Sequence, residues 1–336
     1  MKRSVFLIFF LSAVTFSFLF QAGVAQTCSR TKDEKKTETP AVQSSLPLKL
    51  SGYAQLQAVE RNEAVDSFSI KRARLSLGGN LLKNLRFKLQ VDLTKSPALL
   101  DALAEVTFRP EFNLRAGQFL VPFSLENVTP TSELLTINRS QTVEKLAPGR
   151  DNEAIGRDIG AAVFGSYSIF EYTAGLVNGS GINKTDNNDH KDFVGRLVAK
   201  PLKEISVGFS VYNGRQTVPG NPTNLLRNKL GLELAVNYQR FNLMAEFIQA
   251  KDDLIKKQGW YALGAYSVIK KKFQLIGRID SINLDRSLPG KKTTIWTAGV
   301  NWLLTSKSKL QANYEYYREE TALDHHAALV QLQVGF

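Results

Sequence analysis

The sequence predicts an all-β protein, specifically a transmembrane, antiparallel up-and-down β-barrel of about 16 strands. From residue 48 onward, apolar and polar residues alternate with a period of two, which is typical of strands with two different faces. The connections between these segments alternate between short turns and longer loops, as in outer-membrane barrels. One connection, residues 118–156, is far longer than the others, and we expect it to fold into the lumen and to contain a short helix around residues 132–146.

The N-terminus is typical of an exported protein. Lys2 and Arg3 precede an apolar run of residues 5–20 and then small residues up to Ala25, which predicts a signal peptide over residues 1–25. Residues 26–47 are polar and charged and are expected to form a disordered leader, followed by the barrel over residues 48–336. The single cysteine, Cys28, cannot form an internal disulfide.

Each expected strand is a segment in which one face is apolar and the other is polar or small. Residues 226–239 are the clearest case, because leucines and Val236 alternate with charged or small residues. The predicted strands are residues 48–60, 67–80, 84–94, 101–109, 111–118, 157–165, 169–178, 191–200, 204–213, 226–239, 241–251, 257–269, 271–281, 292–304, 307–318 and 326–336.

Three observations favour a membrane barrel over a soluble one. A barrel of 16 strands is too wide for side chains to fill, so its interior should hold water. The apolar faces carry aromatic residues near strand ends, such as Phe87, Trp296 and Tyr316, as the interfacial girdles of membrane barrels do. The chain also ends on an alternating strand with a terminal aromatic residue, Phe336. The apolar run at the N-terminus is too short to span a bilayer as a helix, and no other segment approaches a spanning helix.

Four segments carry a resemblance to a known family. Residues 69–75 (SIKRARL), 117–126 (GQFLVPFSLE), 156–161 (GRDIGA) and 176–183 (LVNGSGIN) resemble the phosphate-selective porin O and P family, and the likeness extends over residues 48–336. The resemblance implies a 16-stranded barrel in the outer membrane of a Gram-negative bacterium. It also implies a homotrimer whose third external loop folds into the lumen. Residues 118–156 are the third external connection in this sequence.

The resemblance also bears on solutes and assembly. Family members pass phosphate or polyphosphate along a ladder of arginines and lysines, although such a ladder is not matched here residue by residue. Phe336 resembles the C-terminal signature that the barrel-assembly machinery reads. Small hydrophilic solutes and outer-membrane lipid are therefore the expected partners.

The long connection carries charges of both signs. Its acids are Glu126, Glu133, Glu144, Asp151 and Glu153, and its bases are Arg139, Lys145 and Arg150, with Arg157 at the start of the next strand. A constriction with fixed charges of both signs orients dipolar solutes and selects weakly by charge. This loop therefore predicts a constriction without a dedicated phosphate filter, and the alternative is a solvated surface loop.

Basic residues outnumber acids on the polar faces of the predicted strands, which tips the expected preference toward anions. The residues expected to line the pore and attract anions are Arg72, Arg74, Arg86, Lys88, Arg115, Arg196, Arg227, Lys229 and Arg278. An alternative role for the first five of these residues is structural pairing with Asp92, Asp101 and Glu105.

The sequence offers little for catalysis, metals, cofactors or nucleic acid. The three histidines, His190, His325 and His326, are expected in external loops, and no catalytic residue or metal ligand is assigned. Residues 179–181 (GSG) lack the strand-to-helix context of a phosphate-binding loop. The formal charge of +12 could indicate nucleic-acid binding, but the sequence contains no platform of aromatic and basic residues that would support it.

The expected function is that of an outer-membrane porin, in which small hydrophilic solutes diffuse through a water-filled channel with a mild preference for anions such as phosphate. Two alternatives stay open at this point. One is a solute-specific channel of the same shape, and the other is a structural or adhesive barrel without conductance.

Overall fold

The computed structural model describes residues 48–62, 65–217 and 225–336. The predicted signal peptide, residues 1–25, and the predicted leader, residues 26–47, lie outside the described residues and stay predictions. The strands are β1 (Lys49–Arg61), β2 (Ser67–Asn80), β3 (Leu85–Asp92), β4 (Leu99–Arg109), β5 (Phe112–Leu120), β6 (Arg157–Tyr167), β7 (Phe170–Val177), β8 (Asp192–Leu202), β9 (Ile205–Gln216), β10 (Leu225–Tyr238), β11 (Phe241–Asp252), β12 (Ile255–Ile269), β13 (Phe273–Asn283), β14 (Lys292–Leu303), β15 (Lys309–Glu319) and β16 (His325–Gly335).

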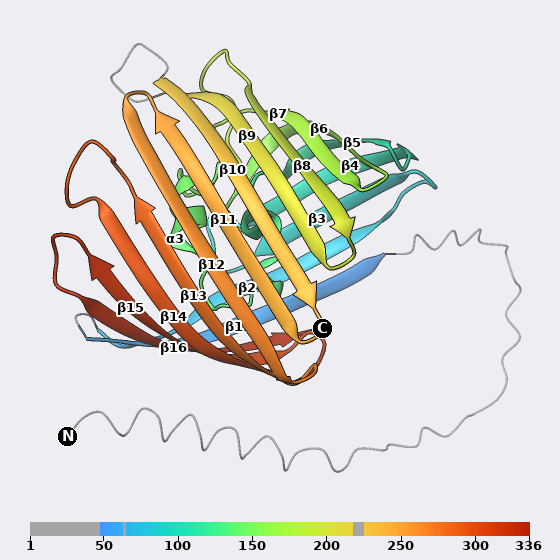
Figure 1. The fold of residues 1–336 in the computed structure, drawn as a ribbon. Helices are drawn as coiled ribbons and strands as arrows, with labels where there is room; N and C mark the ends of the chain where they lie inside the picture. Colours follow the sequence, from blue (N-terminus) through green and yellow to red (C-terminus); the bar gives the residue numbers. More distant parts are fainter. Residues whose placement is uncertain (1–47, 63–64, 218–224) are drawn as a thin grey trace, which may run out of the picture. The chain divides into compact units, whose positions relative to one another are not determined.

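These 16 strands form one closed antiparallel barrel in which each strand pairs with its neighbours in sequence (Figure 1). The last strand closes on the first, with Tyr53 opposite Gly335 and Arg61 opposite Ala327. Closure leaves no unpaired sheet edge, which a barrel in lipid requires because its backbone groups have no water to bind there. The predicted fold class and strand number are confirmed, and strand boundaries differ from the prediction by a few residues.

The alternation in sequence becomes an outward and an inward face. On β10, Leu230, Leu232 and Leu234 are exposed on the outside, whereas Lys229 and Glu233 are buried on the inside. Such an apolar outer face is what a barrel presents to lipid. None of the helices in the described part of the chain is long and apolar enough to cross a bilayer.

Residues 121–156, which we call the lumen loop, connect β5 to β6. The loop contains α2 (Leu125–Val128), the 3-10 turn η1 (Thr131–Glu133) and α3 (Gln141–Leu146), and Figure 1 places α3 within the ring of strands. The prediction began the loop at residue 118, but residues 118–120 continue β5. Its helix over residues 132–146 was also too long, because α3 begins only where Ser140 caps it by accepting a hydrogen bond from Val143 N.

An apolar core lies inside the barrel, between the lumen loop and the wall. Phe123, Val143 and Leu146 of the loop are fully buried against inward side chains such as Ile248 and Tyr261. Burial of one such side chain stabilises a fold by roughly 1.5–3 kcal/mol. The sequence predicted a wide, water-filled lumen, but here the loop and inward apolar residues fill a large part of it.

Two of the three histidines are placed differently from the prediction. His325 and His326 begin β16 instead of lying in a loop, whereas His190 lies in the connection between β7 and β8. The two neighbours stack on different tyrosines, His325 on Tyr317 and His326 on Tyr314. Adjacent strand residues point to opposite faces, which explains the two separate contacts.

Candidate functional site: the lumen and its loop

The lumen loop is attached to β11 by a buried carboxylate. Glu246 points inward and accepts hydrogen bonds from the backbone N–H groups of Leu125 (3.0 Å) and Glu126 (2.7 Å). The hydroxyl of Tyr261 also donates to Glu246, at 2.7 Å. Backbone N–H groups in the first turn of a helix have no partner within it, so Glu246 satisfies groups that α2 leaves free.

A second buried carboxylate holds α3 in the same way. Asp280 of β13 accepts hydrogen bonds from Gln141 N at 2.5 Å and from the hydroxyl of Thr142 at 2.7 Å. Within the loop, Glu126 accepts a hydrogen bond from Ser140 N at 2.9 Å and so ties α2 to the start of α3. Both helices are therefore attached to the inner wall by carboxylates at their N-termini, where the helix dipole favours negative charge.

The end of the loop is held by an ion triplet. Asp151 forms ion pairs with the buried cations Arg227 and Lys229 of β10, the latter at 2.6 Å. Burial alone would raise the pKa of the Asp151 carboxyl, but the charges of Lys229 and Arg227 outweigh it and lower that pKa below its usual value. Asp151 is therefore ionised at neutral pH and links the loop to the wall.

Polar side chains of β13 to β16 bind the middle of the loop. The amine of Lys309 donates to Leu134 O at 2.6 Å, and Asn313 accepts from Ile137 N at 2.8 Å. Arg278 donates to Asn138 O at 2.8 Å and to the hydroxyl of Thr136. Together with the acids of β11 and β13, these contacts secure the loop along the wall from β10 to β16.

Open space lies on the opposite side of the loop, against β2. A cavity of about 510 Å³, which we call the loop-side cavity, is bounded by the wall and by α3. Seven basic residues line it and only two acids, Glu144 and Glu153. The bases are Lys71, Arg72, Arg74, Lys95, Arg139, Lys145 and Arg150.

Arg139 is the least satisfied of these bases. Its side chain donates to Thr129 O at 2.6 Å, yet Nε and Nη1 are buried and have no hydrogen-bond partner. Burial, reinforced by the nearby Arg150, lowers the pKa of Arg139 to about 9, so the group still carries its charge at neutral pH. A buried guanidinium with free donors favours an anion beside it.

Arg150 and Glu144 form the one ion pair that we find across this cavity among the described residues, at 2.8 Å. Burial raises the pKa of the Glu144 carboxyl, but the charge and hydrogen bond of Arg150 outweigh it and lower the pKa overall. Arg150 also donates to the side chain of Asn127 at 2.5 Å. That side chain occupies the space that a Cβ at Gly156 would need, and Gly156 has a φ of +73°.

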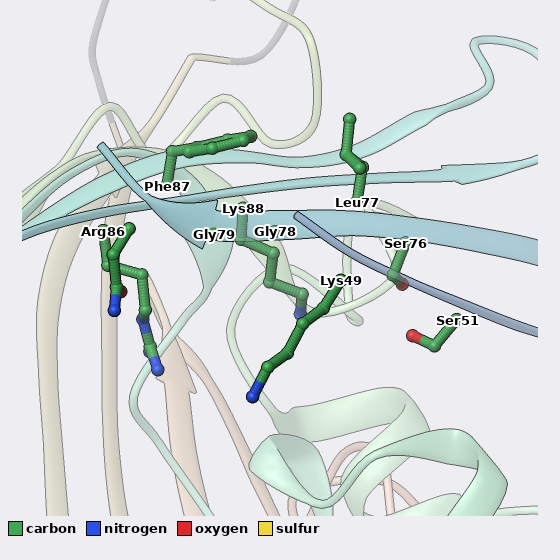
Figure 2. A pocket seen from close by; sticks show the side chains of 10 residues that line it. Lys49, Ser51, Ser76, Leu77, Gly78, Gly79, Arg86, Phe87 and Lys88 are labelled. Carbon is green, nitrogen blue, oxygen red and sulfur yellow. The ribbon is translucent and has the colours of Figure 1, made fainter. Parts of the chain in front are cut away.

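A second cavity, which we call the turn-side cavity, opens at the end of the barrel with the short turns. It has a volume of about 620 Å³ and lies between β1, β2 and β3. Figure 2 shows Lys49, Arg86 and Lys88 pointing into this space, whereas Leu77 and Phe87 point to the other side of the sheet.

The two cavities lie along one strand. Arg72 and Arg74 of β2 line the loop-side cavity, and Ser76 and Gly78, the next inward positions, line the turn-side cavity. Residues two apart on a strand are about 7 Å apart. Basic residues therefore form a track along the inner face of β1 to β3 that reaches both cavities.

The predicted pore-lining residues all lie on strands, but most have carboxylate partners. Their environments fall into two groups. Beside the cavities lie Arg72, which donates to Gln55, Arg74 paired with Asp92, Arg86 paired with Glu105, and Lys88 paired with Asp101. Arg115 lines neither cavity and shares the carboxylate of Glu105. The others are Arg196, paired with Glu233, and Arg227, Lys229 and Arg278, which hold the loop.

The predicted constriction residues lie in different places. Arg139, Lys145 and Arg150 line the loop-side cavity together with the loop acids Glu144 and Glu153. Glu126 is buried within the loop, and Glu133 lies at a different cavity near Lys309. Arg157 is buried and pairs with Asp101 at 2.6 Å. The loop charges thus do not all meet at one constriction.

Sequence reasoning missed three basic residues that line the cavities: Lys49, Lys71 and Lys95. Lys71 is the hardest to predict, because it lies where the register between β1 and β2 shifts by one residue. Such an irregularity changes which side chains face inward. Lys95 lies in the connection after β3, so no strand pattern could assign it to the lumen.

Comparison with known proteins extends these observations. The family described as phosphate-selective porin O and P matches residues 50–228 and 212–336. The chain belongs to this family. An uncharacterized protein of Aquifex aeolicus is 22% identical over 193 residues, which is 48% of this chain and 43% of that protein. The chain therefore aligns with less than half the length of this relative.

Solved outer-membrane structures share the fold. The loop L8 deletion mutant of OmpT of Vibrio cholerae matches with a TM-score of 0.66 at 11% identity, covering 86% of this chain and 99% of that one. The outer-membrane channel DcaP of Acinetobacter baumannii matches with a TM-score of 0.66 at 10% identity, covering 86% and 97%. A trimer form of OmpT has a TM-score of 0.64 at 10% identity, covering 86% and 99%.

Family and fold together identify an outer-membrane porin channel of a Gram-negative bacterium. They point to a channel rather than to an enzyme. The solute, the charge preference and the assembly are separate questions, which depend on the residues of this chain.

Proposed function

We propose that this porin passes small hydrophilic solutes with a preference for anions, along the basic track between the lumen loop and β1 to β3. The observation that carries the proposal is the excess of seven bases over two acids around the loop-side cavity. A lumen lined with one sign of charge concentrates counter-ions and favours their passage.

The separation of charges within the loop supports this preference. The acids Glu126 and Asp151 are engaged in holding the loop, one through Ser140 N and the other through Arg227 and Lys229. Because the charge of Asp151 is compensated by its ion pairs, Asp151 contributes little to the field in the cavity. Arg139 lines the cavity and has no ion pair among the described residues, and inorganic phosphate or another compact oxyanion suits such a cation.

The test is the reversal potential of the purified protein in planar bilayers under a potassium chloride gradient. We expect an anion-selective sign for the wild-type chain. In the Arg72→Gln/Arg139→Gln variant the preference for anions should fall several-fold. Each change removes one positive charge, and the attraction between such a charge and a nearby anion is about 1 kcal/mol when the effective dielectric is near that of water. Phosphate added to one side should reduce chloride current in the wild type more than in the variant.

The matched control is Lys270→Gln/Lys272→Gln, which removes two exposed charges from the turn between β12 and β13. This control should keep the wild-type reversal potential. Equal selectivity in all three proteins would contradict the anion track, and an absence of any conductance would contradict the channel itself, leaving a structural or adhesive barrel.

The same proposal includes a homotrimer, a catalytically inactive barrel and assembly through Phe336. The trimer form of OmpT, a protein of the same fold, supports the first of these. Mass determination in detergent would give three copies of the chain. A monomer under conditions in which the channel conducts would contradict the trimer alone.

A further inference from the structure

The outer face of β12 to β15 has a hollow that the channel does not use. These four strands are neighbours in the barrel (Figure 1). The hollow has a volume of about 500 Å³, its floor is formed by Ala262, Gly277 and Ala298, and its sides by Trp296, Tyr314 and Tyr316. Because β13 turns Ile276 and Arg278 inward, Gly277 faces out of the barrel.

Gly277 shows that the hollow is open. A Cβ atom built at this position would meet nothing within 4 Å. Membrane barrels cover their outer face with large apolar side chains, but Gly277 stands opposite Gly264 of β12 and Ala298 of β14, and these three small residues leave a gap in that cover. In a membrane such a gap is filled by an acyl chain or by a side chain of another protein.

Charge decides between these occupants. The outward positions of β11 to β15 carry four charged residues, all of them basic and all at the end with the long loops: Lys251, Lys256, Lys292 and Arg318. We find no hydrogen bond or ion pair for these four side chains in the part of the chain that the structure describes. Inward cations of the same strands, such as Lys257 and Arg278, have carboxylate partners.

Lys251 and Lys256 stand directly opposite each other in the β11–β12 register. Like charges at such a pair destabilise a sheet, and no ion pair compensates them among the described residues. Three acids at this end of the barrel are engaged elsewhere, since Asp285 binds Ser287, Glu320 accepts from Gly290 N and Asp324 accepts from the hydroxyl of Tyr316. An external anion would remove the repulsion.

The spacing fits one amphipathic molecule. Along β14, Lys292 lies four residues from Trp296, which is about 13 Å. The charged band therefore lies at the level of lipid head groups, and the hollow lies at the level of acyl chains below it. Trp296 and Tyr316, with ring centroids 5.7 Å apart, mark the boundary between the two, as aromatic girdles do.

We propose that the outer face of β11 to β15 binds a phosphorylated glycolipid of the outer leaflet. Its phosphates bind Lys251, Lys256, Lys292 and Arg318, and one of its acyl chains fills the hollow over Gly277. Basic clusters beside a membrane attract anionic lipid at about 1 kcal/mol per residue, and four such residues aligned above a chain-sized hollow give specificity. The site depends on the outer-membrane location and not on the ion preference of the lumen.

Native mass spectrometry of the detergent-solubilised protein would test this site. The probe is diphosphorylated lipid A, compared with its dephosphorylated form. The wild-type chain should retain the diphosphorylated lipid, and the Lys251→Gln/Lys256→Gln variant should bind it about tenfold or more weakly. Gly277→Leu, whose Cβ would meet nothing within 4 Å, should occupy the hollow and weaken binding with every charge intact.

The Lys270→Gln/Lys272→Gln variant provides the matched control, because it removes two charges from the opposite end of the β12–β13 hairpin and should bind lipid as the wild type does. Unchanged conductance in all variants would show that they fold. Equal lipid retention by all variants, or equal retention of the dephosphorylated lipid, would overturn the proposal. A Gly277→Leu variant that alters oligomeric mass without altering lipid binding would assign the hollow to a second copy of the chain and would also overturn it.

Discussion

The inner wall of the barrel consists of two regions that use charge in opposite ways. From β10 to β16, inward acids and bases are engaged with the lumen loop, and Glu246, Asp280 and Asp151 each satisfy groups that would otherwise be buried without a partner. From β1 to β3, Lys71, Arg72 and Lys49 border open cavities and have no carboxylate partner that we find among the described residues, whereas Arg74, Arg86 and Lys88 are ion-paired.

This difference separates structural charge from charge that is free to act on solutes. An inward arginine on β10 or β13 binds the loop, so its replacement should alter the shape of the lumen. An inward arginine on β2 borders the cavity, so its replacement should alter selectivity. The type of residue is the same in both regions, and only its partners differ.

The largest effect is expected from removal of the two carboxylates that hold the loop. The Glu246→Ala/Asp280→Ala variant leaves the N–H groups of Leu125, Glu126 and Gln141 buried without partners. It should lose about 5 kcal/mol or more in the free energy of unfolding, because these three N–H groups and the hydroxyls of Tyr261 and Thr142 lose their acceptors, and each unsatisfied buried group costs about 1–3 kcal/mol. Its single-channel conductance should rise and become noisy as the loop leaves the wall.

Denaturant unfolding and bilayer recording would measure these two effects. Glu171→Ala is the control, since its ion pair with Lys200 is about half exposed and should contribute less than about 1 kcal/mol. Quiet, wild-type conductance in the double variant would mean that the apolar core alone holds the loop.

A smaller effect is expected at Asp151. Asp151→Asn leaves Arg227 and Lys229 buried without their counter-ion, and breaking a buried pair costs about 3–5 kcal/mol locally. Release of only the last turn of the loop should produce brief conductance fluctuations at neutral pH, visible in single-channel traces. Steady traces in this variant would argue that the triplet does not restrain the loop.

The same carboxyl gives a pH dependence with a defined sign. Because the pKa of Asp151 is lowered in the folded state, the stabilisation it provides is fully present above its ordinary pKa of about 3.9 and is lost as the pH falls through the lowered value. The wild type should therefore fluctuate only in strong acid, whereas Asp151→Asn should fluctuate across this range. A pH titration of channel noise would compare the two.

The smallest effect is expected at the turn-side cavity. Lys49→Gln removes an exposed charge at the wide end of the basic track. Anion conductance should fall slightly at low ionic strength and recover near 1 M salt, where the screening length is only about 3 Å. A decrease that persists in high salt would indicate that Lys49 shapes the passage instead of supplying charge.

Much of the fold followed from local pattern. Strict alternation in segments such as residues 226–239 predicted β10 to within one residue, because a strand that separates lipid from the lumen must change polarity at every position. The helix in the loop was predicted too long, since Ser140 sets its start through a cap that periodicity does not reveal. The register shift at Lys71 was not predicted either, because periodicity does not reveal such an irregularity.

The sequence by itself determined a closed barrel of 16 strands, its inward and outward faces and the place of its longest loop, because these depend on periodicity and connection length. It could not determine what the loop charges do. Five acids against three bases predicted weak selectivity, but the tertiary structure turns Glu126 and Asp151 toward partners and leaves three bases and only two acids of the loop beside the loop-side cavity. Only folding decides which charges are compensated, because compensation depends on residues more than 70 positions away, such as Lys229 for Asp151.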